Sequence, residues 1–303
     1  MKLHEIIRAY CALCKPRITL LSTASAAAGF LLAPHGGGRS LAGLTAGVLL
    51  LAGGSCALNH YMDRHLDRLM PRTWNRPLPA GRIRPCAALL FSLVLVAAGL
   101  LLLVRGSLAA AVLGAGTAFW YNCFYTYLKR KSAFAAVPGG VAGALPPAIG
   151  WVSAGGGLPG MELVAVCSLL FLWQIPHSWL LALQWGREYE GAGIPSVAAL
   201  LSREQLTRVL FVWINAAAVT CLLIPLHAAA GSPVSCFLFI AAAAGLSLQG
   251  IRLFREDRDS GVYRAVFRGI NFSMAQVMFL IILDKSGALG GLEQTVRTYL
   301  YGA

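Results

Sequence analysis

Three polar residues at a regular spacing of four are the first candidates for chemistry in this sequence. Asn59, Asp63 and Asp67 lie where a long apolar run gives way to a basic segment. On an α-helix, residues four apart share one face, so an amide and two carboxylates would project together. Clustered oxygen ligands suit Mg²⁺, above all Mg²⁺ that carries a phosphorylated substrate. A solvated helix end is the alternative, but carboxylates at membrane depth are normally paired or functional, which favours a site.

The segment that follows this motif is rich in arginine and proline. It runs from Arg68 to Arg82 and includes Arg72 and Arg76. Guanidinium groups bind phosphates through paired hydrogen bonds, so the segment can act as a lid over a diphosphate. A plain anchor of positive charge at the membrane surface explains the same composition equally well.

A second run, from residue 121 to residue 131, combines aromatic and basic side chains. Tyr125 precedes Lys129 and Arg130 by about one helical turn. Aromatic residues at a helix end commonly form an interfacial belt, but aromatic faces also attract cations such as a carbocation. The run is therefore either a belt or the wall of a pocket whose mouth carries phosphate-binding cations.

A polar step interrupts a later apolar run. Gln174 and His177 flank Pro176, and such groups require partners inside a membrane. For His177, a hydrogen bond within the core and a role in a site are both consistent with the sequence. Glu188 follows in the same segment and adds an acidic group at the same predicted membrane face. Two acidic positions on one side could hold a metal diphosphate between them.

The elements that position these residues are predicted to be membrane helices. The chain has 303 residues, of which 57% are hydrophobic and 12% charged, whereas a soluble domain has about 25% charged residues. A helix needs about 20 apolar residues to cross a bilayer. We therefore predict an all-α polytopic membrane protein with about nine transmembrane helices in a single domain over residues 1–303. The predicted spans are 18–34, 41–60, 85–104, 107–124, 135–152, 162–183, 207–229, 233–250 and 266–284. The span 135–152 is rich in glycine and proline, so we expect it to be kinked or closely packed.

Positive charge divides between the two predicted membrane faces. With nine crossings, all but four of the 25 lysines and arginines fall on the side of the N-terminus. The four exceptions are Arg39, Arg105, Lys285 and Arg297. This bias predicts that the N-terminus and the candidate site face the cytoplasm, and it explains the net charge of +13 without a nucleic-acid partner. Residues 1–17 lack the pattern of a signal or transit peptide, so we expect a bacterial inner (plasma) membrane. No P-loop or HExxH motif is present, so ATP-driven transport and zinc hydrolysis lack their usual signatures.

Taken in order, these motifs resemble the UbiA-type intramembrane prenyltransferases. The triplet Asn59, Asp63 and Asp67 at the end of the second predicted span carries the resemblance. The longer string Asp63-Arg-x-x-Asp67-x-x-Met70-x-Arg72-Thr73-x-x-Arg76-Pro77 is similar to the branch that farnesylates haem. Further agreement lies in Lys15-Pro16-Arg17, Tyr125-Thr126-x-Leu128-Lys129-Arg130, Gly139-Gly140-x-Ala142-Gly143-Ala144-x-Pro146-Pro147, Trp173-Gln174-x-Pro176-His177 and Tyr189-x-x-Ala192-Gly193-Ile194-Pro195.

The resemblance implies a UbiA-like bundle that transfers a farnesyl group from farnesyl diphosphate to a vinyl group of haem b. The products are haem O and diphosphate, Mg²⁺ is the implied cofactor, and haem b is a substrate. The implied metal ligands are Asn59, Asp63, Asp67 and Glu188, and the implied catalytic residues are Asn59, Asp63, Asp67, Arg72 and Arg76. The implied diphosphate- and haem-binding residues are Lys15, Arg17, Tyr125, Lys129, Arg130, His177 and Tyr189. Besides the lipid bilayer, the implied partners are haem A synthase or assembly proteins of haem–copper terminal oxidases.

Three positions depart from the family pattern. Glu188 stands where an aspartate is usual, Ala135 where an asparagine is usual, and Ser178 where an aromatic residue is usual. Glutamate keeps the charge, so we expect metal binding to survive with a different reach, whereas the other two changes bear on substrate fit. Two other functions remain open: prenylation of an aromatic quinone precursor in the same fold, and haem carriage or transport without catalysis.

Overall fold

The computed structural model describes residues 3–34, 40–227, 233–254 and 260–289, in which it has helices joined by turns and loops and no strand. The helices are α1 (Leu3–Leu13), α2 (Pro16–Leu32), α3 (Leu41–Leu69), α4 (Pro85–Gly106), α5 (Leu108–Phe119), the π-helix η1 (Trp120–Tyr125), α6 (Thr126–Leu128), α7 (Ala136–Ala144), α8 (Pro146–Ser153), α9 (Met161–Gly191), α10 (Val197–Leu200), α11 (Arg203–His227), α12 (Pro233–Arg252) and α13 (Ser260–Lys285). The all-α prediction is confirmed. Arg39 and Arg297, which enter the predicted charge asymmetry, lie outside the described residues.

Six helices in the described part of the chain are long and apolar enough to cross a membrane by themselves. They are α3, α4, α9, α11, α12 and α13, and they match six of the predicted spans. The other three predicted spans fall on shorter or interrupted helices, namely α2 with 17 residues, α5 with η1, and α7 with α8. The chain is thus an integral membrane protein, and nine crossings remain a prediction.

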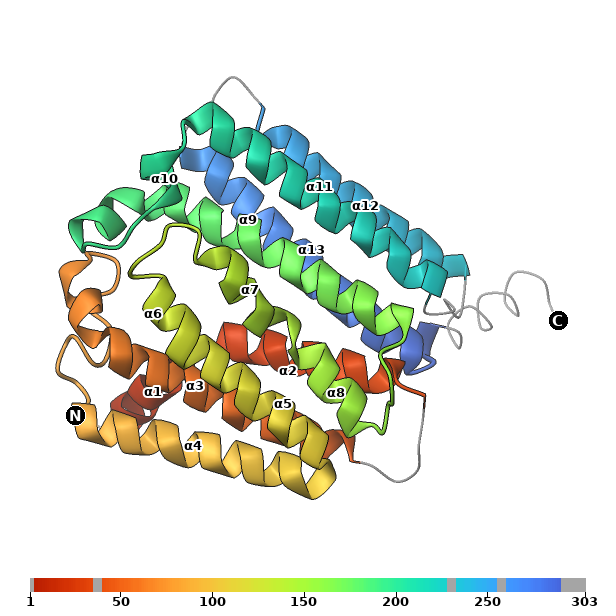
Figure 1. Ribbon diagram of the computed structural model, residues 1–303, viewed down its shortest axis with the longest axis horizontal. Helices are drawn as coiled ribbons and strands as arrows, with labels where there is room; N and C mark the ends of the chain where they lie inside the picture. Colours follow the sequence, from red (N-terminus) through yellow and green to blue (C-terminus); the bar gives the residue numbers. More distant parts are fainter. Residues whose placement is uncertain (1–2, 35–39, 228–232, 255–259, 290–303) are drawn as a thin grey trace.

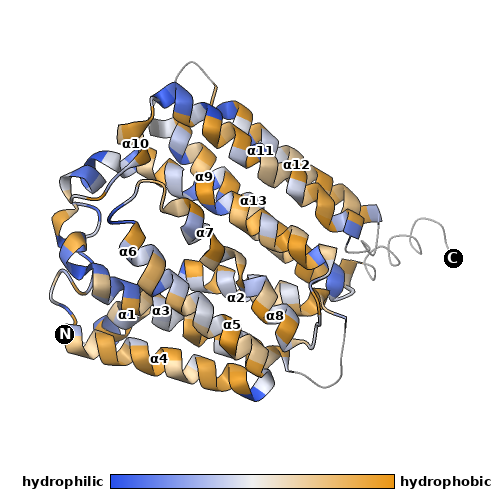
Figure 2. Ribbon diagram, viewed as in Figure 1, coloured by the Kyte–Doolittle hydropathy of each residue, from blue (hydrophilic) through white to orange (hydrophobic). Residues whose placement is uncertain are grey.

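The long helices run side by side in two groups (Figure 1). One group contains α3, α4 and α5, and the other contains α9, α11, α12 and α13. Between them, α2 packs against α3, α8 and α13, while α7 packs against α9. Hydrophilic residues gather at the end of the bundle where α3, α6 and α9 finish, whereas the bodies of α4, α11 and α12 are largely hydrophobic (Figure 2). The candidate polar residues therefore belong to one end of the bundle.

The glycine- and proline-rich span 135–152 is broken as predicted, at Leu145 between α7 and α8. Its second half lies directly against α2. A methyl group at Gly29 would meet the backbone carbonyl of Pro147, and one at Gly150 would meet that of Ala26. Small residues at such positions let membrane helices approach backbone to backbone. The predicted close packing of this span is therefore confirmed as well.

The π-helix η1 lies between α5 and α6, which are otherwise continuous. In η1 the backbone N–H of Thr126 bonds to the carbonyl of Tyr121, five residues earlier. Such π-segments insert one extra residue into a helix and are frequent at functional sites. The indole of Trp120 donates to the carbonyl of Pro138 at 2.7 Å and so ties η1 to α7. This segment delivers the predicted aromatic and basic run to the end of α3.

Candidate active site

The last turns of α3 present the three motif residues on one buried face. The exposed fractions of Asn59, Asp63 and Asp67 are 4%, 6% and 2%. Their spacing of four places them one above another along the helix, as the sequence predicts. Because carboxylates this deeply buried need opposite charges or hydrogen bonds, their partners define the site.

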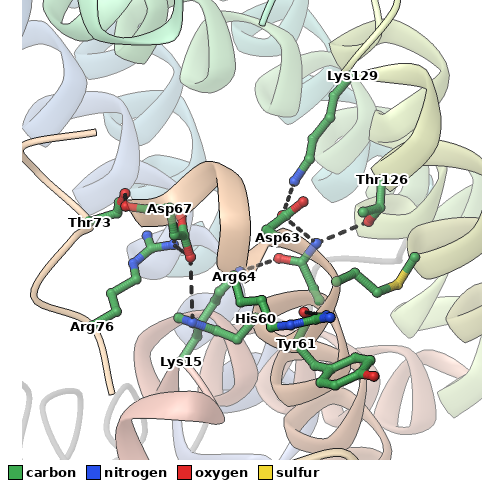
Figure 3. Close-up of polar contacts among 12 residues, drawn as sticks. Lys15, His60, Tyr61, Asp63, Arg64, Asp67, Thr73, Arg76, Thr126 and Lys129 are labelled. Atoms are coloured by element: carbon green, nitrogen blue, oxygen red, sulfur yellow. Dashed lines mark hydrogen bonds and ion pairs between the residues drawn. The ribbon is translucent and has the colours of Figure 1, made fainter. Parts of the chain in front are cut away.

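Asp63 is held by two cations and one amide, and Figure 3 shows the first of these cations, Lys129, pointing at the carboxylate. Lys129 pairs with its Oδ2 atom, and Arg130 Nη2 donates to Oδ1 at 3.1 Å. Asn59 Nδ2 donates to Oδ2 at 3.0 Å and also to Thr126 Oγ1 at 3.0 Å. Lys129 and Arg130, predicted to bind phosphate, therefore surround the central carboxylate of the motif.

Asp67 is held by the arginine-rich segment that follows α3. Arg76 Nη1 lies 2.8 Å from both carboxylate oxygens, and Thr73 Oγ1 donates to the Asp67 backbone carbonyl at 2.8 Å. His60 lies on the other side, with Nδ1 at 4.0 Å from Oδ2. The segment thus folds back over the end of α3. For Arg76, this position favours the interpretation as part of a lid and disfavours the interpretation as a plain anchor at the membrane surface.

Lys15 reaches the same site from the start of α2. Its backbone has φ of +48°, in the left-handed region that is unfavourable for residues other than glycine and for a residue before proline. From this position Nζ donates to Asn59 Oδ1 at 2.7 Å and to Tyr121 Oη at 3.4 Å. Burial lowers the pKa of the Lys15 ammonium below the usual value for lysine. The strained backbone therefore serves to place a cation beside the motif.

Glu188, predicted as a second metal ligand, makes a different contact. Its Oε2 accepts the backbone N–H of Arg72 at 3.1 Å, and Arg72 Nη2 donates to Tyr189 Oη at 3.1 Å. The Arg72 guanidinium also lies 5.6 Å from the ring centre of Trp185. These contacts join the end of α9 to the segment after α3. Glu188 therefore holds this lid, and its role as a metal ligand stays a prediction.

Two predicted residues lie apart from this cluster. Arg17 is exposed on the first turn of α2. His177 pairs with Asn271 on α13, with 2.7 Å between Nδ1 and Oδ1, so its hydrogen bond joins α9 to α13. The sequence is equally consistent with a hydrogen bond in the core and with a role in a site, and the structure shows such a hydrogen bond.

Six contributors to the contacts described above are not predicted as site residues from the sequence. They are His60, Thr73, Tyr121, Thr126, Trp185 and Asn271. Thr73 and Thr126 lie inside motifs quoted in the sequence analysis, and this position in the sequence could have identified them as site residues. No pattern marked Asn271, because its role depends on a partner 94 residues away.

The oxygen donors on α3 fit a hard cation that arrives with its own ligands. Within the described residues, no three His, Cys, Asp or Glu side chains group closely enough to hold a metal ion. The α3 face offers two carboxylates and one amide oxygen. Mg²⁺ typically takes one or two protein carboxylates and completes its octahedron with water and substrate phosphates. The donor set therefore suits Mg²⁺ bound to a phosphorylated substrate better than a resident ion.

Positive charge exceeds negative charge around α3. Four cations reach the two carboxylates and their amide neighbour; they are Lys15, Arg76, Lys129 and Arg130. Beside them the rings of Tyr121 and Tyr125 stack with centroids 5.8 Å apart. The arrangement can bind a polyanion through its cations and can shelter a carbon-centred cation against aromatic faces.

Comparison with known proteins yields one family and a consistent fold. The model of the UbiA prenyltransferase family matches residues 20–275. A protein named protoheme IX farnesyltransferase from Geobacter sulfurreducens is 39% identical over 211 residues, which are 70% of this chain and 78% of that protein. One of the same name from Oleidesulfovibrio alaskensis is 32% identical over 282 residues, covering 92% and 97% of the two chains.

Solved structures share the fold at low sequence identity. A structure described under the biosynthesis of digeranylgeranylglyceryl phosphate synthase in membranes superposes with a TM-score of 0.72 at 15% identity, covering 93% of this chain and 99% of that one. A UbiA homolog from Archaeoglobus fulgidus, bound to GPP and Mg²⁺, superposes with a TM-score of 0.61 at 17% identity, covering 90% and 99%. The predicted bundle architecture is thereby confirmed.

Proposed function

The chain belongs to the UbiA prenyltransferase family, and from this premise we propose that it farnesylates haem b. The donor is farnesyl diphosphate, the acceptor is a vinyl group of haem b, and the products are haem O and diphosphate. The choice of acceptor is supported by the relatives at 32–43% identity, which are named protoheme IX farnesyltransferase.

The observation that carries the proposal is the pair of buried carboxylates matched by an excess of cations. Asp63 is paired with Lys129 and Arg130, and Asp67 is paired with Arg76. A merely structural ion pair would need only one cation for each carboxylate. The surplus gives the site a net positive charge, which suits the diphosphate of a prenyl donor.

In this proposal the cations of the site stabilise the leaving group. Lys129, Arg130 and Arg76 turn from the carboxylates toward the diphosphate as the allylic carbon–oxygen bond breaks and its electron pair leaves with diphosphate. Tyr121 and Tyr125 line the space where the allylic cation forms, and they keep water from it. The vinyl π-electrons of haem then form the new carbon–carbon bond. Water adds to the resulting cation and loses a proton, which completes the hydroxyethylfarnesyl group.

Mg²⁺ is the proposed metal, held by Asp63, Asp67 and the amide oxygen of Asn59. When bound, it neutralises developing charge on the leaving diphosphate as a Lewis acid. Lys15 currently occupies that amide oxygen, so its ammonium would move to the diphosphate on binding. Arg72 and Glu188 contribute by closing the lid against α9.

We further propose that the protein lies in the inner membrane of a bacterium and that its site faces the cytoplasm. The product would pass to haem A synthase or to proteins that assemble haem–copper oxidases. The positive-charge asymmetry of the sequence supports this orientation.

The direct test combines the purified protein with haem b, farnesyl diphosphate and Mg²⁺, followed by mass spectrometry. We expect haem O, and none when farnesyl diphosphate is omitted. Unmodified haem together with a prenylated phenolic acid, when such an acid is added, would favour a quinone-precursor prenyltransferase instead. Haem binding without any product under all conditions would favour a carrier.

A further inference from the structure

A pocket of about 430 Å³ lies between the second half of α9 and the first half of α13. Its lining consists of Gln184, Gly261, Arg264, Phe267 and Arg268. The two arginines are four residues apart, so they project from one face of α13. The described residues that line the pocket include two basic and no acidic side chains, and the volume falls within the range of small-molecule sites. The two guanidinium groups are thus the charged groups of the described lining, and the pocket is of a size to hold one charged part of a ligand.

The inner wall of this pocket continues to His177. The ring of Phe267 lies 4.9 Å from the ring of His177, which lies 4.8 Å from the ring of Trp173. These three rings extend from the arginines toward the middle of α9. Trp173 is buried, whereas His177 and Phe267 are half-buried and present aromatic surface that a planar ligand can pack against.

The hydrogen bonds around His177 fix its tautomer. Asn271 Nδ2 donates to the carbonyl of Phe267 at 2.6 Å, which leaves Asn271 Oδ1 as the acceptor that faces His177. His177 Nδ1 must then carry a proton, so the neutral ring has its lone pair on Nε2. The imidazole is thus held in place, and in its neutral form Nε2 can accept a hydrogen bond or ligate a metal.

We propose that this pocket binds the carboxylate-bearing edge of the prenyl acceptor, with Arg264 and Arg268 pairing with the two propionates of haem b. The macrocycle extends from them past Phe267 to His177. This inference rests on the proposed function and adds to it the residues that recognise the acceptor. A pocket of this volume holds one edge of a macrocycle, and the vinyl groups, on the opposite edge, remain outside it.

The position of the pocket along α9 agrees with this assignment. Gln184 in the pocket precedes Glu188 by one helical turn, a rise of about 6 Å. Glu188 bonds to Arg72, in the segment that also pairs with Asp67. The end of α9 therefore borders both the pocket and the lid of the diphosphate site. A haem anchored by its propionates at α13 can direct its vinyl edge toward the prenyl donor.

The test compares haem b with its dimethyl ester, which keeps the macrocycle and the vinyl groups but lacks both carboxylates. The variant is Arg264→Gln with Arg268→Gln in the full chain. Both arginines are exposed, so the fold should tolerate the change. The control is Arg252→Gln, which alters an exposed arginine at the end of α12. Binding is measured by titration of the haem absorbance in detergent, and turnover is measured as haem O formed.

We expect haem b to bind about 10- to 100-fold more weakly for each arginine removed, as for hydrogen bonds between charged groups. Affinity for the dimethyl ester should be the same in wild type and variant, and the control should match wild type throughout. If the double variant does not fold, Arg268→Gln and Arg268→Lys are compared instead. Arg268→Gln should lose the affinity expected for one arginine, whereas Arg268→Lys should keep most of it.

The pocket assignment would be overturned by equal losses for haem b and its ester, or by no loss for either. It would also be overturned if the variant lost only binding of anionic lipid vesicles, because the arginines would then be headgroup contacts. If wild type forms no haem O at all, the proposed function itself fails. If wild type forms haem O and the variant is indistinguishable from it, the pocket assignment alone fails.

Discussion

Replacing Asp63 with asparagine removes one negative charge from the centre of the site without changing its shape. Asp63 accepts hydrogen bonds from Lys129, Arg130 and Asn59. In the proposed reaction the same carboxylate holds Mg²⁺ on the prenyl donor. Asparagine can still accept hydrogen bonds through its oxygen, but it is a much weaker ligand for a hard cation. We therefore expect turnover to fall far more than stability.

The size of each effect follows from the exposure of the partners. The side chains of Lys129 and Arg130 are 22% and 35% exposed, so both cations can regain water when the carboxylate is lost. The stability cost should then be about 1–2 kcal/mol, below the cost of stranding a fully buried charge. Loss of one preorganised electrostatic contact at the reacting group should reduce turnover about 100- to 1,000-fold.

A matched control is available at the other end of the bundle. Asp284 on α13 is also buried, with 5% of its side chain exposed, and it pairs with Lys285 at 3.6 Å. Asp284→Asn should cost comparable stability and leave turnover near the wild-type level. Unfolding is followed in detergent, and haem O is quantified by mass spectrometry. Turnover of Asp63→Asn within tenfold of wild type, in a folded protein, would refute the metal-site reasoning.

Three further predictions follow from the same contacts. Chelation of divalent cations should abolish haem O formation, and added Mg²⁺ should restore it; turnover that persists in excess chelator would contradict a metal requirement. Arg76→Met should destabilise the protein by about 3–5 kcal/mol because it strands Asp67, whose side chain is 3% exposed. Asp67→Asn should lower the free energy of unfolding by less, since the Arg76 side chain is 31% exposed and can regain water. Unfolding titrations in which Asp67→Asn is the more destabilising variant would contradict this reasoning. Gly139→Ala should lower turnover because the added methyl group would collide with the ring of Tyr125, whereas Gly116→Ala, with open space around it, should leave turnover unchanged in the same assay.

Local pattern accounts for the predictions that the structure bears out. Apolar runs of bilayer length predicted the long helices, because the need to satisfy backbone hydrogen bonds in lipid leaves few alternatives to a helix. The spacing of Asn59, Asp63 and Asp67 predicted one shared face, because helical periodicity fixes which residues align. The glycines and prolines of 135–152 predicted a broken, closely packed span for equally local reasons.

The partners of those residues were decided by tertiary structure. Lys129 lies 66 positions from Asp63, and Glu188 lies 116 positions from Arg72. No pattern in one sequence states which distant charges will meet. Glu188 was predicted as a metal ligand because it is acidic and near the right membrane face. Helix packing brings its carboxylate to the backbone N–H of Arg72, and its role as a metal ligand stays a prediction.

The sequence by itself thus determined a helical membrane protein, the polar face of α3 and the family to which its motifs are similar. The cations that neutralise Asp63 and Asp67 are known only from the folded chain. The same holds for the stacking of Tyr121 on Tyr125 in η1 and for the pocket between the arginines of α13 and α9. The physical reason is that periodicity and hydropathy act over a few residues along the chain. Charge pairing and pocket shape depend on helices that meet only after folding.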